Sequence, residues 1–235
     1  MIEVIGMRSA RTVFCMLIGI GLLAANARGA GDPAEDPEVM KTLLAMSKMS
    51  TWHHPDQWGM TAGMRAYAHR RYGDAMKYFE VGAQYADKLS QLSIGLMYKN
   101  GEGVAKDPVM AYAWMDLACE RGYPQFVATR DELKETLTPA QLARAESQRT
   151  QLAKRYADEV AQPRMVFELK QAIMQMTGSL AGYDAAGKYP KKDWDPALYF
   201  ATRDREWKNS VTVGPVEEVD PPATAPKQSD NSDKP

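Results

Sequence analysis

The middle of this 235-residue chain carries the same pattern of small and large side chains twice. The matched pairs, each 36 positions apart, are Ala75 and Ala111, Tyr78 and Trp114, Phe79 and Met115, and Gly82 and Ala118. Within each unit these positions share one face of an α-helix, because their spacing follows the helical period. A glycine lies upstream of each pattern, Gly63 in the first unit and Gly95 in the second. Two helix hairpins that cross closely at their small residues are therefore predicted, an arrangement typical of α-solenoids.

A glycine-containing turn separates the two predicted helices of the second unit. Gly101 and Gly103 supply the backbone freedom of the turn, and Asp107 followed by proline is typical of a helix N-cap and first helical position. Tyr98 and Trp114 are expected to fill the space beside the crossing of these two helices. Gly122 lies at the end of the unit.

The second unit resembles a Sel1-like repeat. The stretch from residue 94 to residue 107 reads IGLMYKNGEGVAKD, and the downstream Ala111, Trp114, Ala118 and Gly122 keep the family spacing. Cys119 stands where the family has the second alanine of a pair. The first unit has a shorter turn and is more similar to a tetratricopeptide repeat, through Gly63, Tyr72, Ala75, Phe79 and Gly82. The resemblance implies an all-α, right-handed α-solenoid with repeats at about 57–88 and 89–123.

Two repeats do not stack into a stable core alone, so flanking helices are expected to complete the domain at 37–177. The sequence pattern predicts capping helices over 37–48, 124–136, 139–160 and 163–177. Helical periodicity then ends, and an irregular segment is predicted over 178–213, with Trp194, Tyr199, Phe200 and Trp207 available to pack back on the repeats. Residues 214–235 contain five prolines among mostly polar residues, which predicts a disordered tail.

The N-terminus has the pattern of a secretory signal peptide. Arg8 and Arg11 precede a 13-residue apolar run that is shorter than the roughly 20 residues of a membrane-spanning helix. Ala25, Asn26 and Ala27 form a small-x-small cleavage pattern, so cleavage after Ala27 and a short linker over 28–36 are predicted. The mature protein is then expected to be periplasmic or secreted. An uncleaved N-terminal membrane anchor is the alternative.

Composition narrows the possible functions. The chain has 29 Lys and Arg residues against 30 Asp and Glu residues, which argues against a nucleic-acid-binding surface. Two cysteines, Cys15 and Cys119, exclude a disulfide framework or a multi-cysteine zinc site. Cys119 is expected to be buried and inert within its helix. We identify no catalytic constellation, metal site or cofactor site in the sequence.

The histidines and methionines leave one metal hypothesis open. His53 and His54 precede a proline, where solvated surface residues are the expected interpretation. Met46, Met49, Met60 and Met64 are close to them in sequence, and thioethers with imidazole suit Cu(I). Methionines more often fill irregular helical cores, which is the alternative to a copper site.

Arg70 and Arg71 form a separate basic pair, which is expected to be solvated at a turn between helices.

The resemblance implies an adaptor or scaffold that binds an envelope protein or peptide on its concave face. In the related tetratricopeptide family the first helix of each hairpin lines the groove, which makes Met60, Met64, Tyr67, Leu96 and Lys99 the candidate binding residues. Two other hypotheses are a periplasmic copper-handling protein and an envelope hydrolase acting on cell-wall or β-lactam substrates. No membrane partner is expected unless the N-terminal segment is uncleaved.

Overall fold

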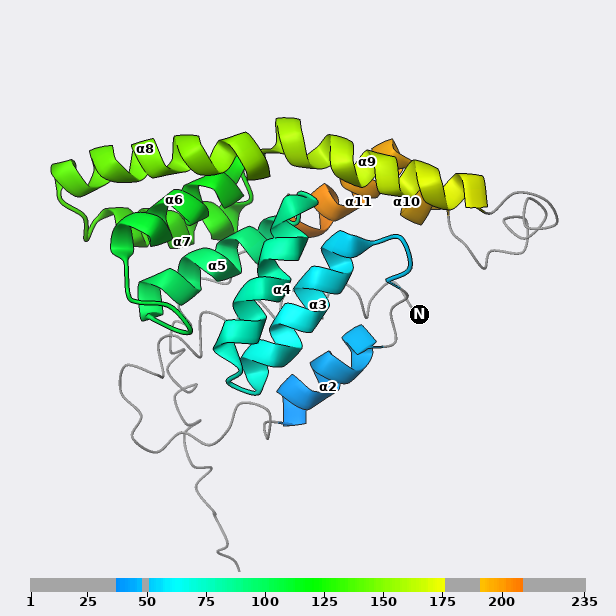
Figure 1. Cartoon of the computed structure of the whole chain (residues 1–235), viewed down its shortest axis with the longest axis horizontal. Helices are drawn as coiled ribbons and strands as arrows, with labels where there is room; N and C mark the ends of the chain where they lie inside the picture. The colour runs from blue at the N-terminus through cyan, green and yellow to red at the C-terminus, as the bar shows by residue number, and fades with distance from the viewer. Residues whose placement is uncertain (1–36, 48–50, 176–190, 209–235) are drawn as a thin grey trace, which may run out of the picture.

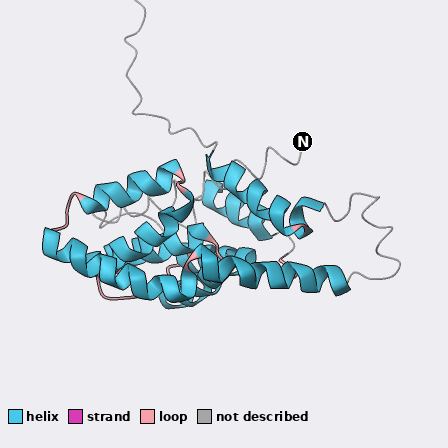
Figure 2. Cartoon of the chain, turned by 90° about the horizontal axis from the view of Figure 1, so that it is seen from above, coloured by secondary structure: helices cyan, strands magenta, loops and turns pink. Residues whose placement is uncertain are grey.

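A computed structural model describes residues 37–47, 51–175 and 191–208. Within these ranges every regular element is a helix, which confirms the all-α prediction for the described part of the chain (Figure 2). The elements are α2 (Pro37–Ser47), α3 (Pro55–Ala68), α4 (Tyr72–Gln84), α5 (Lys88–Asn100), α6 (Pro108–Ala118), the 3₁₀ helix η2 (Cys119–Arg121), α7 (Pro124–Lys134), α8 (Pro139–Tyr156), α9 (Asp158–Gln175), α10 (Lys191–Trp194) and α11 (Pro196–Lys208). The predicted signal peptide, linker and tail lie outside the described residues. None of the described helices has the length and apolar character needed to span a membrane.

The two predicted hairpins are α3 with α4 and α5 with α6, and α4 packs against α5 (Figure 1). The crossings use the repeated residues in the same way. A Cβ atom on Gly63 would lie 2.5 Å from the Phe79 ring, and one on Gly95 would lie 2.7 Å from the Met115 side chain. Phe79 and Met115 are a matched pair, so the sequence repeat corresponds to equivalent helix contacts.

The tightest crossing in the first hairpin joins Gly59 and Gly82. A Cβ atom on Gly59 would lie 2.4 Å from the backbone nitrogen of Gly82, so the two backbones meet without a side chain between them. The repeat identified Gly82 as a crossing residue, but Gly59 has no counterpart in the second unit and was missed.

The turn between α5 and α6 has the predicted form. Gly101 and Gly103 have φ values of 79° and 73°, the left-handed region that favours glycine. The Asp107 side chain accepts hydrogen bonds from the backbone N–H groups of Val109 and Met110, and the proline after it begins α6. The turn packs back on the first hairpin, where the Tyr67 hydroxyl donates to Glu102 at 2.7 Å.

The C-terminal capping helices differ from the predicted boundaries. One helix was expected over 139–160 and the next from residue 163, but α8 ends at Tyr156 and α9 begins at Asp158. Gln91 explains this position, because its side-chain amide donates at 2.8 Å to the Tyr156 carbonyl, which a continuous helix would use internally. Pro163 lies inside α9 rather than at its start. The two helices run nearly end to end above the hairpins (Figure 1).

The irregular segment predicted over 178–213 is wrong for residues 191–208, which form α10 and α11. Their aromatic side chains pack back on the body: Trp194, Tyr199 and Trp207 are buried. Trp207 joins the main core of the hairpins, whereas Trp194 and Tyr199 form a second apolar cluster. That cluster, here called the C-terminal core, consists of Met165, Leu169, Ala172, Trp194 and Tyr199.

Candidate functional site

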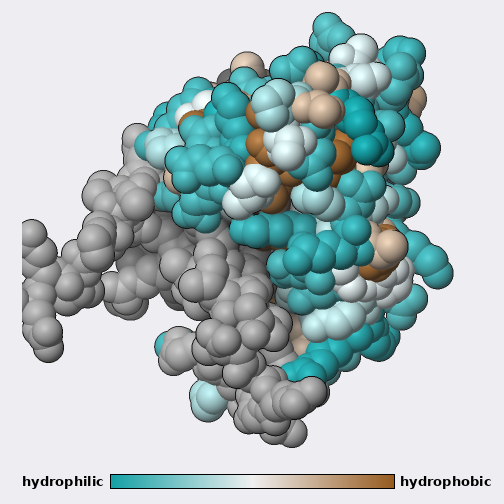
Figure 3. All heavy atoms as spheres, turned by 90° about the vertical axis from the view of Figure 1, so that its left-hand side faces the viewer, coloured by the Kyte–Doolittle hydropathy of each residue, from teal (hydrophilic) through white to brown (hydrophobic). Residues whose placement is uncertain are grey.

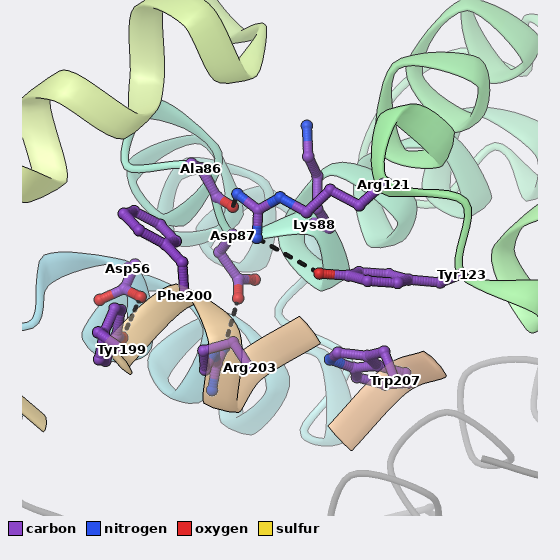
Figure 4. Close-up of a pocket in the computed structure, with 10 residues that line it drawn as sticks. All are labelled: Asp56, Ala86, Asp87, Lys88, Arg121, Tyr123, Tyr199, Phe200, Arg203 and Trp207. Atoms are coloured by element: carbon purple, nitrogen blue, oxygen red, sulfur yellow. Dashed lines mark hydrogen bonds and ion pairs between the residues drawn. The ribbon is translucent and has the colours of Figure 1, made fainter. Parts of the chain in front are cut away.

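The most elaborate polar arrangement in the described residues lies where α11 meets the N-terminal ends of three earlier helices (Figure 4). Tyr199, Arg203 and Trp207 are spaced four residues apart, so they project from one side of α11. Their partners lie at the starts of α3, α5 and α7. We call this surface the first-helix face and define it by Asp56, Gln57, Asp87, Tyr123 and Phe126.

The Tyr199 side chain is held at the start of α3. Its hydroxyl donates to Asp56 at 2.5 Å and accepts from the Gln57 side chain at 3.0 Å. The ring lies beside His54, the N-cap residue of α3, with 5.1 Å between ring centroids. Tyr199 therefore contributes both an apolar ring and a hydroxyl to this contact.

Arg203 reaches the start of α5. Its guanidinium donates at 2.7 Å to Asp87, whose side chain is 2% exposed. The other carboxylate oxygen of Asp87 accepts from the backbone N–H of Ser90 and so caps α5. Burial acts to lower the pKa of Arg203, but the nearby Tyr199, Asp87 and Asp56 outweigh burial. The pKa of Arg203 is therefore raised, and its guanidinium stays charged.

Trp207 completes the contact at the start of α7. Its ring lies 5.0 Å from Phe126 and 6.2 Å from Tyr123, measured between centroids. The Tyr123 hydroxyl donates at 2.6 Å to Asp204, which lies about one turn before Trp207 on α11. The contact between the end of α11 and the start of α7 is thus an aromatic cluster with one polar edge.

A partly buried ion network lies beside these contacts. Arg121 donates to both carboxylate oxygens of Asp158, at 2.7 and 2.9 Å, and to the Ala86 carbonyl at 3.1 Å. Lys88 is 2% exposed and contacts Glu120 at 2.7 Å and Asp158 at 3.0 Å. Burial acts to raise the pKa of Asp158, but Arg121 and Lys88 outweigh burial and lower this pKa. The network ties α5, η2 and α9 together.

Asp56 and His54 are less completely satisfied. Asp56 Oδ1 and His54 Nδ1 are buried without a hydrogen-bond partner among the described residues. Burial raises the pKa of Asp56 to about 6, although Arg203 and Tyr199 act against the shift. Burial lowers the pKa of His54 to about 4, with Arg203 adding to the effect. A cavity of about 10 Å³ adjoins Asp56, about the size of one water molecule.

The candidate binding residues from the sequence lie elsewhere. Met60, Met64, Tyr67 and Leu96 are all less than 10% exposed and belong to the main core, and Lys99 is half-buried on α5. The sequence pattern placed them correctly on first helices, but on the sides that pack inward. A partner-binding role for these residues stays a prediction, and the first-helix face is formed by other residues at the starts of α3, α5 and α7.

The structure also places the residues of the metal and thiol hypotheses. His54 is buried against Trp194 and Tyr199, which corrects the expected surface position, while His53 contacts Glu168 at 3.6 Å. Met46 joins Met60 and Met64 in the main core, and Met49 lies outside the described residues. Among the described residues, no three His, Cys, Asp or Glu side chains form a cluster that could hold a metal ion.

Cys119 lies at the C-cap of α6 and not within the helix, and it is partly buried. Burial raises the pKa of its thiol to about 12, with Asp116 and Asp131 adding to the shift against the opposing Arg130 and Lys88. Since the thiolate is the reactive form, this thiol is a poor nucleophile at neutral pH.

One sequence signal for the site was present and unused. The spacing of Tyr199, Arg203 and Trp207 fits one helical face, but the prolines and glycines around this segment hid the helix. Asp56 and Asp87 resemble ordinary helix-start residues in the sequence, so nothing local separates them from simple caps.

Exposed apolar side chains are found outside the site as well. The outer side of α9 presents Phe167 at 58% and Met174 at 62% exposure, and a groove there is lined in part by Pro163 and Val166. The opposite end of the molecule, which Figure 3 views, is mainly hydrophilic with scattered apolar residues.

Comparison with models of known protein families and with curated proteins finds no match to this chain.

Proposed function

We propose that this chain is a non-catalytic adaptor of the bacterial cell envelope that binds a partner protein or peptide. In this proposal the hairpins form a short right-handed α-solenoid of Sel1-like type, capped by α8. One observation carries it: α11 lies against the N-terminal ends of α3 and α5, the first helices of the two hairpins, and of the following helix α7, through side chains at regular spacing. Helical repeat proteins bind peptides along surfaces built in this way.

Two further observations support the proposal. The hairpins use matched residues for equivalent contacts, Gly63 with Phe79 and Gly95 with Met115, as stacked repeats do. The polar groups of the first-helix face bind a helix and are not arranged around a reactive group. Tyr199 and Arg203 engage the carboxylates of Asp56 and Asp87 directly.

The proposal is tested by photo-crosslinking in cells that express the tagged, normally exported chain. A photoreactive residue replaces Trp58 or Leu198, which are 44% and 43% exposed; Trp58 follows Gln57 of the first-helix face in sequence, and Leu198 precedes Tyr199, which contacts that face. The matched control carries it at Glu135, which is exposed just beyond the far end of α7.

We expect one dominant envelope protein to be captured from positions 58 and 198 and not from position 135. Equal capture of the same proteins from all three positions, or no capture from any of them, would contradict the adaptor proposal.

A further inference from the structure

We infer that the first-helix face is a helix-binding site that α11 fills within the single chain, and that the partner is a helix in which two aromatic side chains flank an arginine at four-residue spacing. This inference rests on the proposed function and deepens it, because it names the chemistry of the partner. It follows from the spacing, charge and polar character of the contacts that α11 makes (Figure 4).

The spacing defines what the face can read. Tyr199 contacts the start of α3, Arg203 the start of α5 and Trp207 the start of α7. Side chains at i, i+4 and i+8 lie on one side of a helix, so a single helix reaches all three places at once. An extended peptide would separate the same side chains by about 13 Å per four residues, more than twice the helical rise, and would not match the three places.

The charge of the face favours arginine at the central position. Removal of α11 takes away Arg203 and Asp204. What remains is three cations, Lys88, Arg121 and Arg149, and a larger group of carboxylates: Asp56, Asp87, Glu120 and Asp158. The three cations are already paired with Glu120 or Asp158. A partner that covers Asp87 without a cation would leave this carboxylate buried without an ion partner, which is costly, so the bound helix needs a cation there.

The interface with α11 also resembles an exchangeable contact. It contains several charged or polar pairs, and Asp56 Oδ1 and His54 Nδ1 have no hydrogen-bond partner among the described residues. Surfaces that separate and rejoin are more polar than the permanent interior of a domain. The opposite side of α11 is exposed at Leu198, Arg205 and Lys208, so the helix is covered on its reading side and open on the other.

The test measures binding of a fluorescent peptide of residues 191–208 to the full-length chain by anisotropy. Three chains are compared: the unchanged protein, a release variant with Tyr199→Ala, Arg203→Ala and Trp207→Ala, and a control variant with Leu198→Ala, Arg205→Ala and Lys208→Ala. The control changes the exposed side of the same helix.

The release variant is expected to bind the peptide at least about tenfold more tightly than the unchanged and control chains. In those chains the tethered α11 competes at a high effective concentration, commonly in the millimolar range. A peptide carrying Arg203→Glu is expected to lose binding to the release variant, because glutamate would face Asp87. Equal affinity for all three chains, or equal binding of the two peptides, would overturn the inference.

Helical circular dichroism is recorded first for each chain. If the release variant loses its helical signal, the single variant Arg203→Ala replaces it, with a smaller gain in affinity expected. If that variant also loses the signal, α11 is a structural part of the core and the inference is wrong. Crosslinking to an envelope partner combined with failed peptide binding would remove this inference and leave the adaptor proposal standing.

Discussion

At the scale of single residues, the glycines of the first hairpin separate into those that the crossing requires and those that it does not. Gly59→Ala is expected to lower the free energy of unfolding by about 1–3 kcal/mol, because its Cβ would meet the backbone of Gly82 at 2.4 Å. Gly73→Ala in α4 meets nothing within 4 Å and should raise stability by about 0.5–1 kcal/mol. Urea unfolding followed by circular dichroism measures both, and equal effects would contradict the crossing.

His54 and Asp56 are expected to give the stability of the protein two opposite dependences on pH. The lowered pKa of His54, about 4, gives stability that is present above pH 6.5 and lost as the pH falls through about 4. The raised pKa of Asp56, about 6, gives stability that is present below pH 3.8 and lost as the pH rises through about 6. In the unchanged protein these trends partly cancel.

Single substitutions should therefore reveal each trend. Asp56→Asn leaves the His54 effect, so its stability relative to the unchanged protein should fall by about 2 kcal/mol between pH 7 and pH 4. His54→Asn leaves the Asp56 effect and should show a relative gain of similar size over the same range. Urea midpoints at several pH values test this, and parallel curves for the three proteins would disprove it.

These residues also show where sequence reasoning was limited. The side chains at the helix crossings were predictable, because small residues at a repeated spacing have few other uses. His54 was expected at the surface, since a histidine before a proline is usually solvated. Its burial depends on Trp194 and Tyr199, which are more than a hundred positions away and whose approach no local pattern describes.

At the scale of helices, Arg121 is the connection that local patterns did not predict. Its guanidinium joins the Ala86 carbonyl before α5 to Asp158 at the start of α9, and it lies 3.5 Å from Asp204 on α11. One side chain thus fixes three elements that are distant in sequence. The helices themselves were largely predictable from capping and periodicity, but their mutual arrangement depends on such contacts.

Arg121→Ala is expected to destabilise the protein by about 1–3 kcal/mol, because the partly buried Asp158 and the Ala86 carbonyl would lose the guanidinium that donates to them. Arg121→Lys should recover part of the loss, since lysine cannot donate to both carboxylate oxygens in the same way. Arg71→Ala is the matched control, because its 3.9 Å pair with Asp74 is exposed and should contribute less than about 0.5 kcal/mol. A loss at Arg121 no larger than that at Arg71 would contradict the role of the network.

The boundary at Ala157 illustrates the same limit. A break near Pro163 was the reasonable expectation from sequence, because proline usually begins a helix. Two tertiary contacts set the observed break. The Gln91 side-chain amide on α5 donates a hydrogen bond to the Tyr156 carbonyl, and Asp158 pairs with Lys88. A tertiary contact therefore overrides a local preference.

At the scale of the whole molecule, the predicted signal peptide defines the residue at which the mature chain should begin. We expect the protein released from the periplasm by osmotic shock to begin at residue 28, as read by N-terminal sequencing. Replacing Ala25 and Ala27 with leucine should block cleavage, because the processing site needs small side chains. Recovery of the full-length chain from the cytoplasm would refute the prediction of export.

The overall architecture was predictable only in part. The all-helical class and the two hairpins followed from the repeat, because both depend on contacts between neighbours in the sequence. The first-helix face and its occupant did not, since they unite the beginning of the helical region with residues 191–208. Met60 and Leu96 show the consequence: the correct helices were identified, but their binding side was assigned to residues that point into the core.

The separation between the main core and the C-terminal core has a consequence for how the protein opens. Met165, Leu169 and Ala172 make their buried contacts with Trp194 and Tyr199, whereas the main core is formed by the hairpins, the helices next to them and Trp207. Two cores of unequal size act as two cooperative units with different opening free energies. Backbone amides of α9 and of the first half of α11 should therefore exchange with deuterated solvent together, and sooner than those of α5 and α6. Local unfolding would begin at the C-terminal core while the two helix hairpins stay folded.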